Sequence, residues 1–192
     1  MVFQKFIVLF FATHTPVVMG MMQPQTTADR LQALIATSAQ RLSIGKQVAL
    51  SKWDSKVPVE DAPREAHVIA AAIQAGELRG LDQTSVATFF KAQIEANKLV
   101  QYSLLAEWYR LGNAPVHSSI DLANTIRPEL DQIQTALIAE LADTTNIRAK
   151  ASCPTELALA VGKYVAAHQA DLSDLDAIAL DRALATACIE KR

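Results

Sequence analysis

Apolar residues recur at the spacing of an α-helix from residue 31 onward. The first series includes Leu31, Leu34, Ile35 and Leu42 and continues to Trp53, so its members share one helical face. No strand-like alternation of apolar and polar residues follows residue 26. The chain has 6 glycines and 7 prolines among 192 residues, too few for the many turns of an all-β protein. The sequence therefore predicts an all-α fold.

Capping and helix-breaking residues divide this pattern into helices. Asp61 and Ser173 are candidate N-caps, and Gly112 follows the third series. Pro128 is compatible with a helix only near its start or at a kink. With no internal repeat or linker, we expect a single-domain bundle of about six helices. Their expected ranges are 31 to the Val57-Pro58 break, 61 to 76–80, 82–111, about 122–145, about 154–169 and 173–189.

The first 25 residues differ from the rest of the chain. Lys5 is the only charged residue before Asp29, and the apolar run 6–12 follows it. This is the pattern of a secretory signal peptide, and the run is shorter than the ~20 apolar residues of a membrane span. We expect a leader over residues 1–25 and a mature domain over 26–192, with no membrane association after the leader is removed. The alternative is a helix packed on the core.

The chain contains two cysteines, Cys153 and Cys188. In an exported protein these are expected to form a disulfide. The bridge would close a loop of 36 residues and stabilise the fold by about 4 kcal/mol in the chain-entropy model. The alternative is two buried free thiols, as in a cytosolic protein.

Composition and motifs exclude several classes of function. The balance of 18 basic against 20 acidic residues gives a net charge of −2, which argues against a nucleic-acid partner. The sequence has no Gly-rich phosphate loop, H-E-x-x-H, C-x-x-C or G-x-S-x-G motif. The four histidines are too far apart in sequence to suggest a local metal site. We therefore expect no metal and no cofactor.

Several charged and polar residues occupy helical positions that are otherwise apolar. Arg41 and Lys52 are 11 residues apart, almost three helical turns, so they share a face with Val48 between them. Individually, such residues are most often solvated side chains or caps. Together they offer cations and amide donors to a ligand rich in carboxylates. The set comprises Arg41, Lys52, Asp61, Arg64, Glu65, Asn97 and Gln101.

The order and spacing of this set resemble the all-helical AroQ-type chorismate mutases. The matching pattern is Arg-x10-Lys-x8-Asp-x2-Arg-Glu from Arg41 to Glu65, followed by Asn97-x3-Gln101. The exported gamma subclass also has a leader, a C-terminal helical extension and one disulfide, which match the apolar run 6–12, residues 122–192 and the pair Cys153 and Cys188. The resemblance implies a periplasmic or secreted homodimer with chorismate as its substrate.

The family's reaction is an intramolecular Claisen rearrangement of chorismate to prephenate, which needs no cofactor. The enzyme holds a dianion in a near-attack conformer and stabilises charge on the breaking ether oxygen. The resemblance implies that Arg41 holds a carboxylate and that Lys52 donates to a carboxylate and to the ether oxygen. It implies Gln101 as the second donor to the ether oxygen and Arg64 as a further catalytic cation.

The remaining family positions have supporting roles. Asp61 and Glu65 would receive the ring hydroxyl or orient their neighbours, and Asn97 would contact a carboxylate. Arg127 is the candidate for a final arginine supplied by the same chain, and it aligns only after a shift of one residue. Val68 stands where some exported members have a glutamine that contacts a carboxylate.

Two other functions fit the same residues. An isochorismate-pyruvate lyase shares this helical fold and a similarly cationic site, and its products are salicylate and pyruvate. A non-catalytic periplasmic helical binding protein would leave Arg41, Lys52 and Arg64 solvated.

Overall fold

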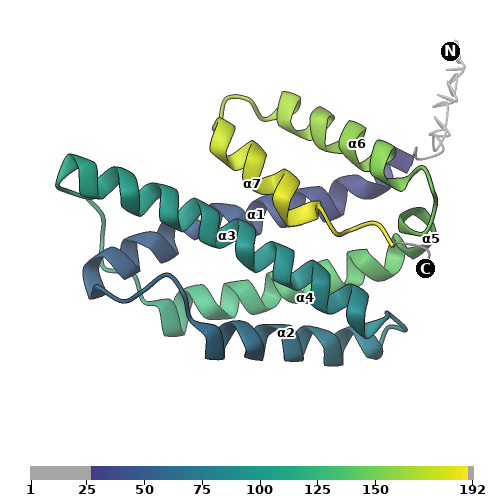
Figure 1. The fold of residues 1–192 in the computed structure, drawn as a ribbon, viewed down its shortest axis with the longest axis horizontal. Helices are drawn as coiled ribbons and strands as arrows, with labels where there is room; N and C mark the ends of the chain where they lie inside the picture. The colour runs from purple at the N-terminus through teal and green to yellow at the C-terminus, as the bar shows by residue number, and fades with distance from the viewer. Residues whose placement is uncertain (1–26, 190–192) are drawn as a thin grey trace, which may run out of the picture.

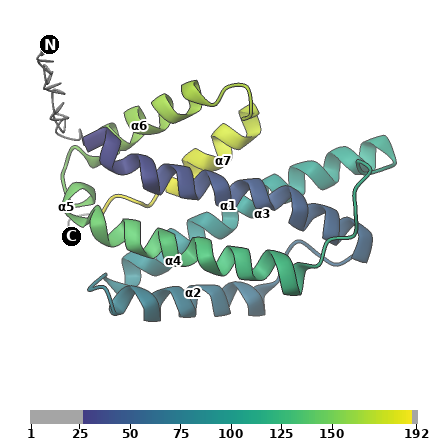
Figure 2. The same ribbon diagram turned by 180° about the vertical axis from the view of Figure 1, so that it is seen from behind.

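The computed structural model describes residues 27–189, which form a bundle of helices with no strand in that range (Figures 1 and 2). The all-α prediction is confirmed. Between residues 27 and 189, no helix is long and apolar enough to cross a lipid bilayer. The predicted leader lies outside the described residues. The elements are α1 (Thr27–Ser55), α2 (Ala62–Glu77), α3 (Gln83–Leu111), the π-helix η1 (Leu122–Ile126), α4 (Arg127–Asp143), α5 (Thr145–Arg148), α6 (Cys153–Ala167) and α7 (Asp174–Leu184).

Most predicted helix ends are confirmed, and local hydrogen bonds explain them. The Asp61 side chain accepts from the Arg64 N–H at 3.2 Å and caps α2. Ser173 and Asp176 form a capping box at the start of α7. Gly112 ends α3 with φ of +78°, a left-handed conformation that glycine adopts without steric cost.

Four features differ from the predictions. Helix α1 begins at Thr27, four residues before Leu31. The predicted helix 122–145 is divided, because η1 precedes α4 and Pro128 lies in the first turn of α4. The short helix α5 was not predicted. It follows a bend at Thr144, whose hydroxyl donates to the Glu140 carbonyl at 2.6 Å, a contact that often bends helices. The last helix ends at Leu184 instead of residue 189.

The early end of α7 follows from contacts with the buried Arg148. Its guanidinium donates to the Ala187 carbonyl at 2.8 Å and to the Leu141 carbonyl at 3.1 Å. The Ile189 N–H donates to the Arg148 carbonyl at 2.8 Å. Backbone groups that would continue α7 are therefore paired with Arg148, and burial lowers the pKa of this guanidinium to about 10.

The two longest helices, α1 and α3, pack against each other through the middle of the bundle (Figures 1 and 2). Helices α2 and α4 lie side by side on one side of this pair, and α6 and α7 cover the other side. Phe89 and Phe90 are fully buried in the core. Buried Gln93 joins three helices, because its amide donates to the Ser38 hydroxyl at 3.0 Å and to the Ala183 carbonyl at 3.1 Å.

Cys153 and Cys188 form a disulfide, with 5.9 Å between their Cα atoms. The predicted pairing is confirmed. The bond joins the start of α6 to the segment after α7, next to the Arg148 contacts.

Replacing both cysteines with serine should lower the free energy of unfolding by about 4 kcal/mol, because the unfolded chain regains the freedom of the closed loop. Denaturant unfolding followed by circular dichroism measures this change. Reducing the wild-type protein should have a similar effect, and reducing the double variant should have none. Equal stability of the oxidised wild type and the double variant would contradict the expectation.

Candidate active site

A pocket opens between α1, α2, α3 and the η1–α4 segment. All eight residues predicted for ligand binding line it, and so does Val68. The helix spacing therefore brings together side chains that are up to 86 positions apart in the sequence, from residue 41 to residue 127. The eight are Arg41, Lys52, Asp61, Arg64, Glu65, Asn97, Gln101 and Arg127.

The guanidinium of Arg41 is the most deeply placed cation of the pocket. The residue is 6% exposed, and its buried Nε has no hydrogen-bond partner among residues 27–189. Burial and the charge of Arg64 lower the pKa of Arg41 to about 10, while Asp131 acts in the opposite direction. Since buried polar groups are normally paired, an unpartnered guanidinium at this place favours an anionic ligand.

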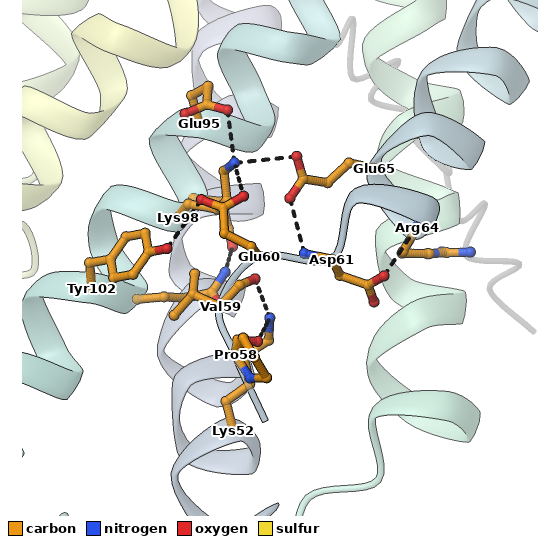
Figure 3. Close-up of polar contacts among 12 residues, drawn as sticks. Lys52, Pro58, Val59, Glu60, Asp61, Arg64, Glu65, Glu95, Lys98 and Tyr102 are labelled. Atoms are coloured by element: carbon orange, nitrogen blue, oxygen red, sulfur yellow. Dashed lines mark hydrogen bonds and ion pairs between the residues drawn. The ribbon is translucent and has the colours of Figure 1, made fainter. Parts of the chain in front are cut away.

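The ammonium of Lys52, in the last turn of α1, reaches the segment that leads into α2. It donates to the Pro58 carbonyl at 2.9 Å and to the Val59 carbonyl (Figure 3). Burial lowers the pKa of Lys52 below its ordinary value of 10.5, although nearby carboxylates, Asp61 above all, oppose this shift. Because an ammonium has three N–H donors, one donor remains for a ligand.

The amides of Asn97 and Gln101 form a chain on α3. The Asn97 Nδ2 donates to the Arg41 carbonyl at 3.0 Å, and the Asn97 Oδ1 accepts from the Gln101 Nε2 at 2.7 Å. A backbone carbonyl can only accept, so it determines the orientation of both amides. A Cβ atom on Gly45 would lie 3.2 Å from the Asn97 Nδ2, so glycine at this position lets Asn97 approach α1.

Two arginines lie at the side of the pocket formed by α2 and α4. Arg64 forms an ion pair with Asp131, with 3.2 Å between Nη2 and Oδ1. Arg127, the first residue of α4, is exposed. Within the described part of the chain, Arg41, Lys52 and Arg127 form no ion pair. The pocket thus holds cations without internal counter-ions.

Several lining residues were not predicted from the sequence. Lys98 and Asp131 are the charged ones among them. Lys98 lies beside Asn97 in an apolar helix, the same signal that identified Asn97 and Gln101. The apolar lining residues on the helices could not be recognised from the sequence, because they fit the helix pattern of the core. The uncharged lining residues that were not predicted are Val48, Val59, Ile94, Leu122, Ile126, Leu130 and Gln134.

Between residues 27 and 189, no group of three or more His, Cys, Asp or Glu side chains is arranged to hold a metal ion. His67, His117 and His168 lie on separate elements there, and His14 lies outside the described range.

The loop between α3 and η1 is attached to the end of α1 by His117. The ring Nδ1 lies 2.8 Å from the Pro115 carbonyl, and the ring Nε2 lies 3.0 Å from Asp54 Oδ2. Since both ring nitrogens face acceptors, the Pro115 carbonyl and then Asp54 raise the pKa of His117 above 6.5. The loop leads into the segment that carries Arg127.

Comparison with known proteins identifies the family of the chain. The family profile "Chorismate mutase type II" matches residues 29–102. The secreted chorismate mutase of Mycolicibacterium smegmatis is 32% identical over 126 residues, which are 64% of this chain and 69% of the relative. The chain belongs to the chorismate mutase family.

Solved chorismate mutase structures extend the similarity beyond the profile. The crystal structure of the chorismate mutase from Burkholderia phymatum is 41% identical, with a TM-score of 0.81 over 85% of this chain and 99% of that one. The enzyme from Burkholderia thailandensis is 33% identical, with a TM-score of 0.78 over 83% of this chain and 99% of that one. The likeness therefore includes the C-terminal helices.

The raised pKa of His117 predicts a pH-dependent loop attachment. A group with a raised folded-state pKa stabilises the fold below its unfolded pKa, and this contribution is lost as pH rises through the folded pKa. An NMR titration of the ring protons should give a midpoint above 6.5, and Asp54→Asn should lower that midpoint. A wild-type midpoint at or below 6.5, or an unchanged midpoint in Asp54→Asn, would contradict the described contact.

Proposed function

We propose that this chorismate mutase family member binds chorismate in the described pocket and isomerises it to prephenate. The observation that carries the proposal is the buried guanidinium of Arg41, which forms no ion pair with any residue from 27 to 189 and lines the pocket together with Lys52 and Arg127, which form none there either. Chorismate is a dicarboxylate, so it supplies the negative charge that the pocket lacks. The affinity for a dianion follows from charge-assisted hydrogen bonds in a largely apolar enclosure.

The reaction makes modest chemical demands on the protein. One ether bond breaks and one carbon–carbon bond forms within a single molecule, with no proton transfer. Catalysis therefore depends on holding the compact conformer and on stabilising charge that develops on the ether oxygen. Arg41, Arg64 and Arg127 hold the two carboxylates in this proposal.

Two donors are available for the ether oxygen. The free N–H of Lys52 is one, since the other two are directed to the Pro58 and Val59 carbonyls. The Gln101 amide is the other, since one of its two N–H groups is donated to Asn97. The charge-assisted hydrogen bond from Lys52 and the neutral one from Gln101 both strengthen as the ether oxygen gains charge, so they lower the activation barrier of the rearrangement.

The acidic side chains have supporting roles in this proposal. Asp61 caps α2 by accepting from the Arg64 N–H at 3.2 Å and so orients the helix that carries Arg64. Glu65 is an acceptor for the ring hydroxyl of the substrate. Asn97 keeps one N–H for a substrate carboxylate, while its other amide contacts orient Gln101.

The protein acts outside the cytoplasm. The similar protein of Mycolicibacterium smegmatis is named a secreted chorismate mutase, and the disulfide agrees with an oxidising compartment. A leader over residues 1–25 would direct the export. We further propose a homodimer, as the family resemblance implies.

Lys52→Ala should reduce kcat by about 10²–10³-fold, because it removes a donor that acts mainly in the transition state. The loss of the ultraviolet absorbance of chorismate measures the rate, and product analysis identifies prephenate. Lys46→Ala, at an exposed position of the same helix, is the control and should behave as wild type. A wild-type protein that forms no prephenate, or that releases pyruvate from isochorismate instead, would reject the proposed function.

Gln101→Glu should make the reaction dependent on pH. A carboxyl group donates to the ether oxygen only when it is protonated, whereas an amide donates at every pH. The kcat of the variant should fall as pH rises from about 5 to about 8, while that of the wild type stays nearly constant. A wild-type decline is expected only at alkaline pH, where Lys52 loses its proton. A steep wild-type loss of kcat just above neutral pH would contradict the role of Gln101.

A further inference from the structure

Lys98 lines the pocket, and its ammonium contacts three carboxylates (Figure 3). It lies 2.9 Å from Glu60 Oε2, 2.9 Å from Glu95 Oε1 and 3.3 Å from Glu65 Oε2. The Lys98 side chain is 9% exposed. These contacts join the middle of α3 to the start of α2 and to the residues before it, and the family pattern gives Lys98 no role.

The three contacts use all the donors of the Lys98 ammonium, which has three N–H groups. Burial alone would lower the pKa of Lys98, but the hydrogen bonds to Glu60, Glu95 and Glu65 raise it above its ordinary value. The group is therefore protonated and has no donor left for a molecule in the pocket. Lys98 therefore offers a ligand no hydrogen bond of its own, and its donors all serve the carboxylates that it holds.

Of these three carboxylates, Glu65 lines the pocket. Its Oε2 accepts from Lys98, and its Oε1 accepts from the Asp61 N–H at 3.3 Å (Figure 3). A donor on each oxygen determines the orientation of the carboxylate. An ionised carboxylate has about four acceptor sites, so about two remain for a hydroxyl in the pocket.

We propose that Lys98 is a positioning residue that holds Glu65 in the orientation that accepts the ring hydroxyl of the substrate. The inference rests on the proposed function, because it takes chorismate as the ligand. Without the ammonium, Glu65 would lie near the carboxylate of Glu60 with no cation between them, and repulsion would turn it away. An uncompensated Glu65 would also repel a dianionic substrate.

Losing this orientation should weaken substrate binding more than it slows the chemical step. The ring hydroxyl takes no part in bond breaking or bond formation, so its contact with Glu65 is similar in the ground state and the transition state. Loss of a contact that is equal in the ground state and the transition state raises KM and changes kcat little.

A double-mutant cycle tests the proposal in the full-length mature protein. Lys98→Met should raise KM about tenfold, as expected for a charge-assisted hydrogen bond, with kcat changed less than about threefold. If Lys98 acts through Glu65, the KM of Lys98→Met/Glu65→Gln should equal that of Glu65→Gln within about twofold. Lys91→Met, at an exposed position of α3, is the matched control and should leave both constants unchanged.

Two results would overturn the role of Lys98. Multiplicative effects of the two substitutions would mean that Lys98 acts independently of Glu65, and an unchanged KM in Lys98→Met would mean that Glu65 needs no support. Thermal unfolding of each variant identifies a purely structural defect, and Lys98→Gln replaces Lys98→Met in the same cycle if the latter fails to fold. Turnover of chorismate by the wild type tests the proposed function separately, so an active wild type with a multiplicative cycle rejects only the role of Lys98.

Discussion

The guanidinium of Arg41 is a charge enclosed between helices that no carboxylate of residues 27–189 pairs with, and the rest of the site is organised around it. Removing an ion from water costs several kcal/mol even after the surrounding protein relaxes. An internal carboxylate would offset this cost, but it would also compete with an anionic ligand. The bundle instead tolerates the unpaired charge, and its apolar core and disulfide supply the stability that such a site lowers.

The acidic residues of the pocket are placed so that they do not neutralise Arg41. Asp61 caps a helix, Asp131 pairs with Arg64 at the edge, and Glu65 is held by Lys98 and a backbone N–H. Each carboxylate therefore has a partner of its own before a ligand arrives. The site keeps positive charge at its centre and places its negative charges at the periphery, as a dianion with a neutral hydroxyl requires.

Most of the fold and much of the site could be predicted from the sequence, for reasons that particular residues illustrate. Asp61, Ser173 and Gly112 determine helix ends through local hydrogen bonds or backbone conformation, so their effects depend on nearby sequence alone. Arg41 and Lys52 share a face because 11 residues are almost three turns. The convergence of all eight predicted residues on one pocket agrees with these local rules, while their chemical roles stay predictions.

Two of the features that were missed depend on contacts between distant segments, and a third depends on a local hydrogen bond. The end of α7 is determined by the contacts of Arg148, which lies 36 residues before Leu184. No local sequence pattern predicts these contacts. The bend before α5 comes from a hydroxyl of Thr144 that could equally have faced solvent. The role of Lys98 depends on Glu60 and Glu65, which contact it from the segment before α2 and from α2 itself. Long-range pairing limited the predictions for α7 and Lys98, whereas at Thr144 the limit was a local hydrogen bond.

The π-helix η1 affects which residue at the start of α4 supplies the pocket with its last arginine. Its hydrogen bonds span five residues, as from the Ile126 N–H to the Asp121 carbonyl, whereas an α-turn spans four. One additional residue in a turn rotates everything that follows by about 100°. The residue that faces the pocket from the start of α4 is thus selected by the length of the preceding turn as well as by its own identity. Insertion or deletion of a single residue there, without any substitution, would exchange Arg127 for one of its neighbours.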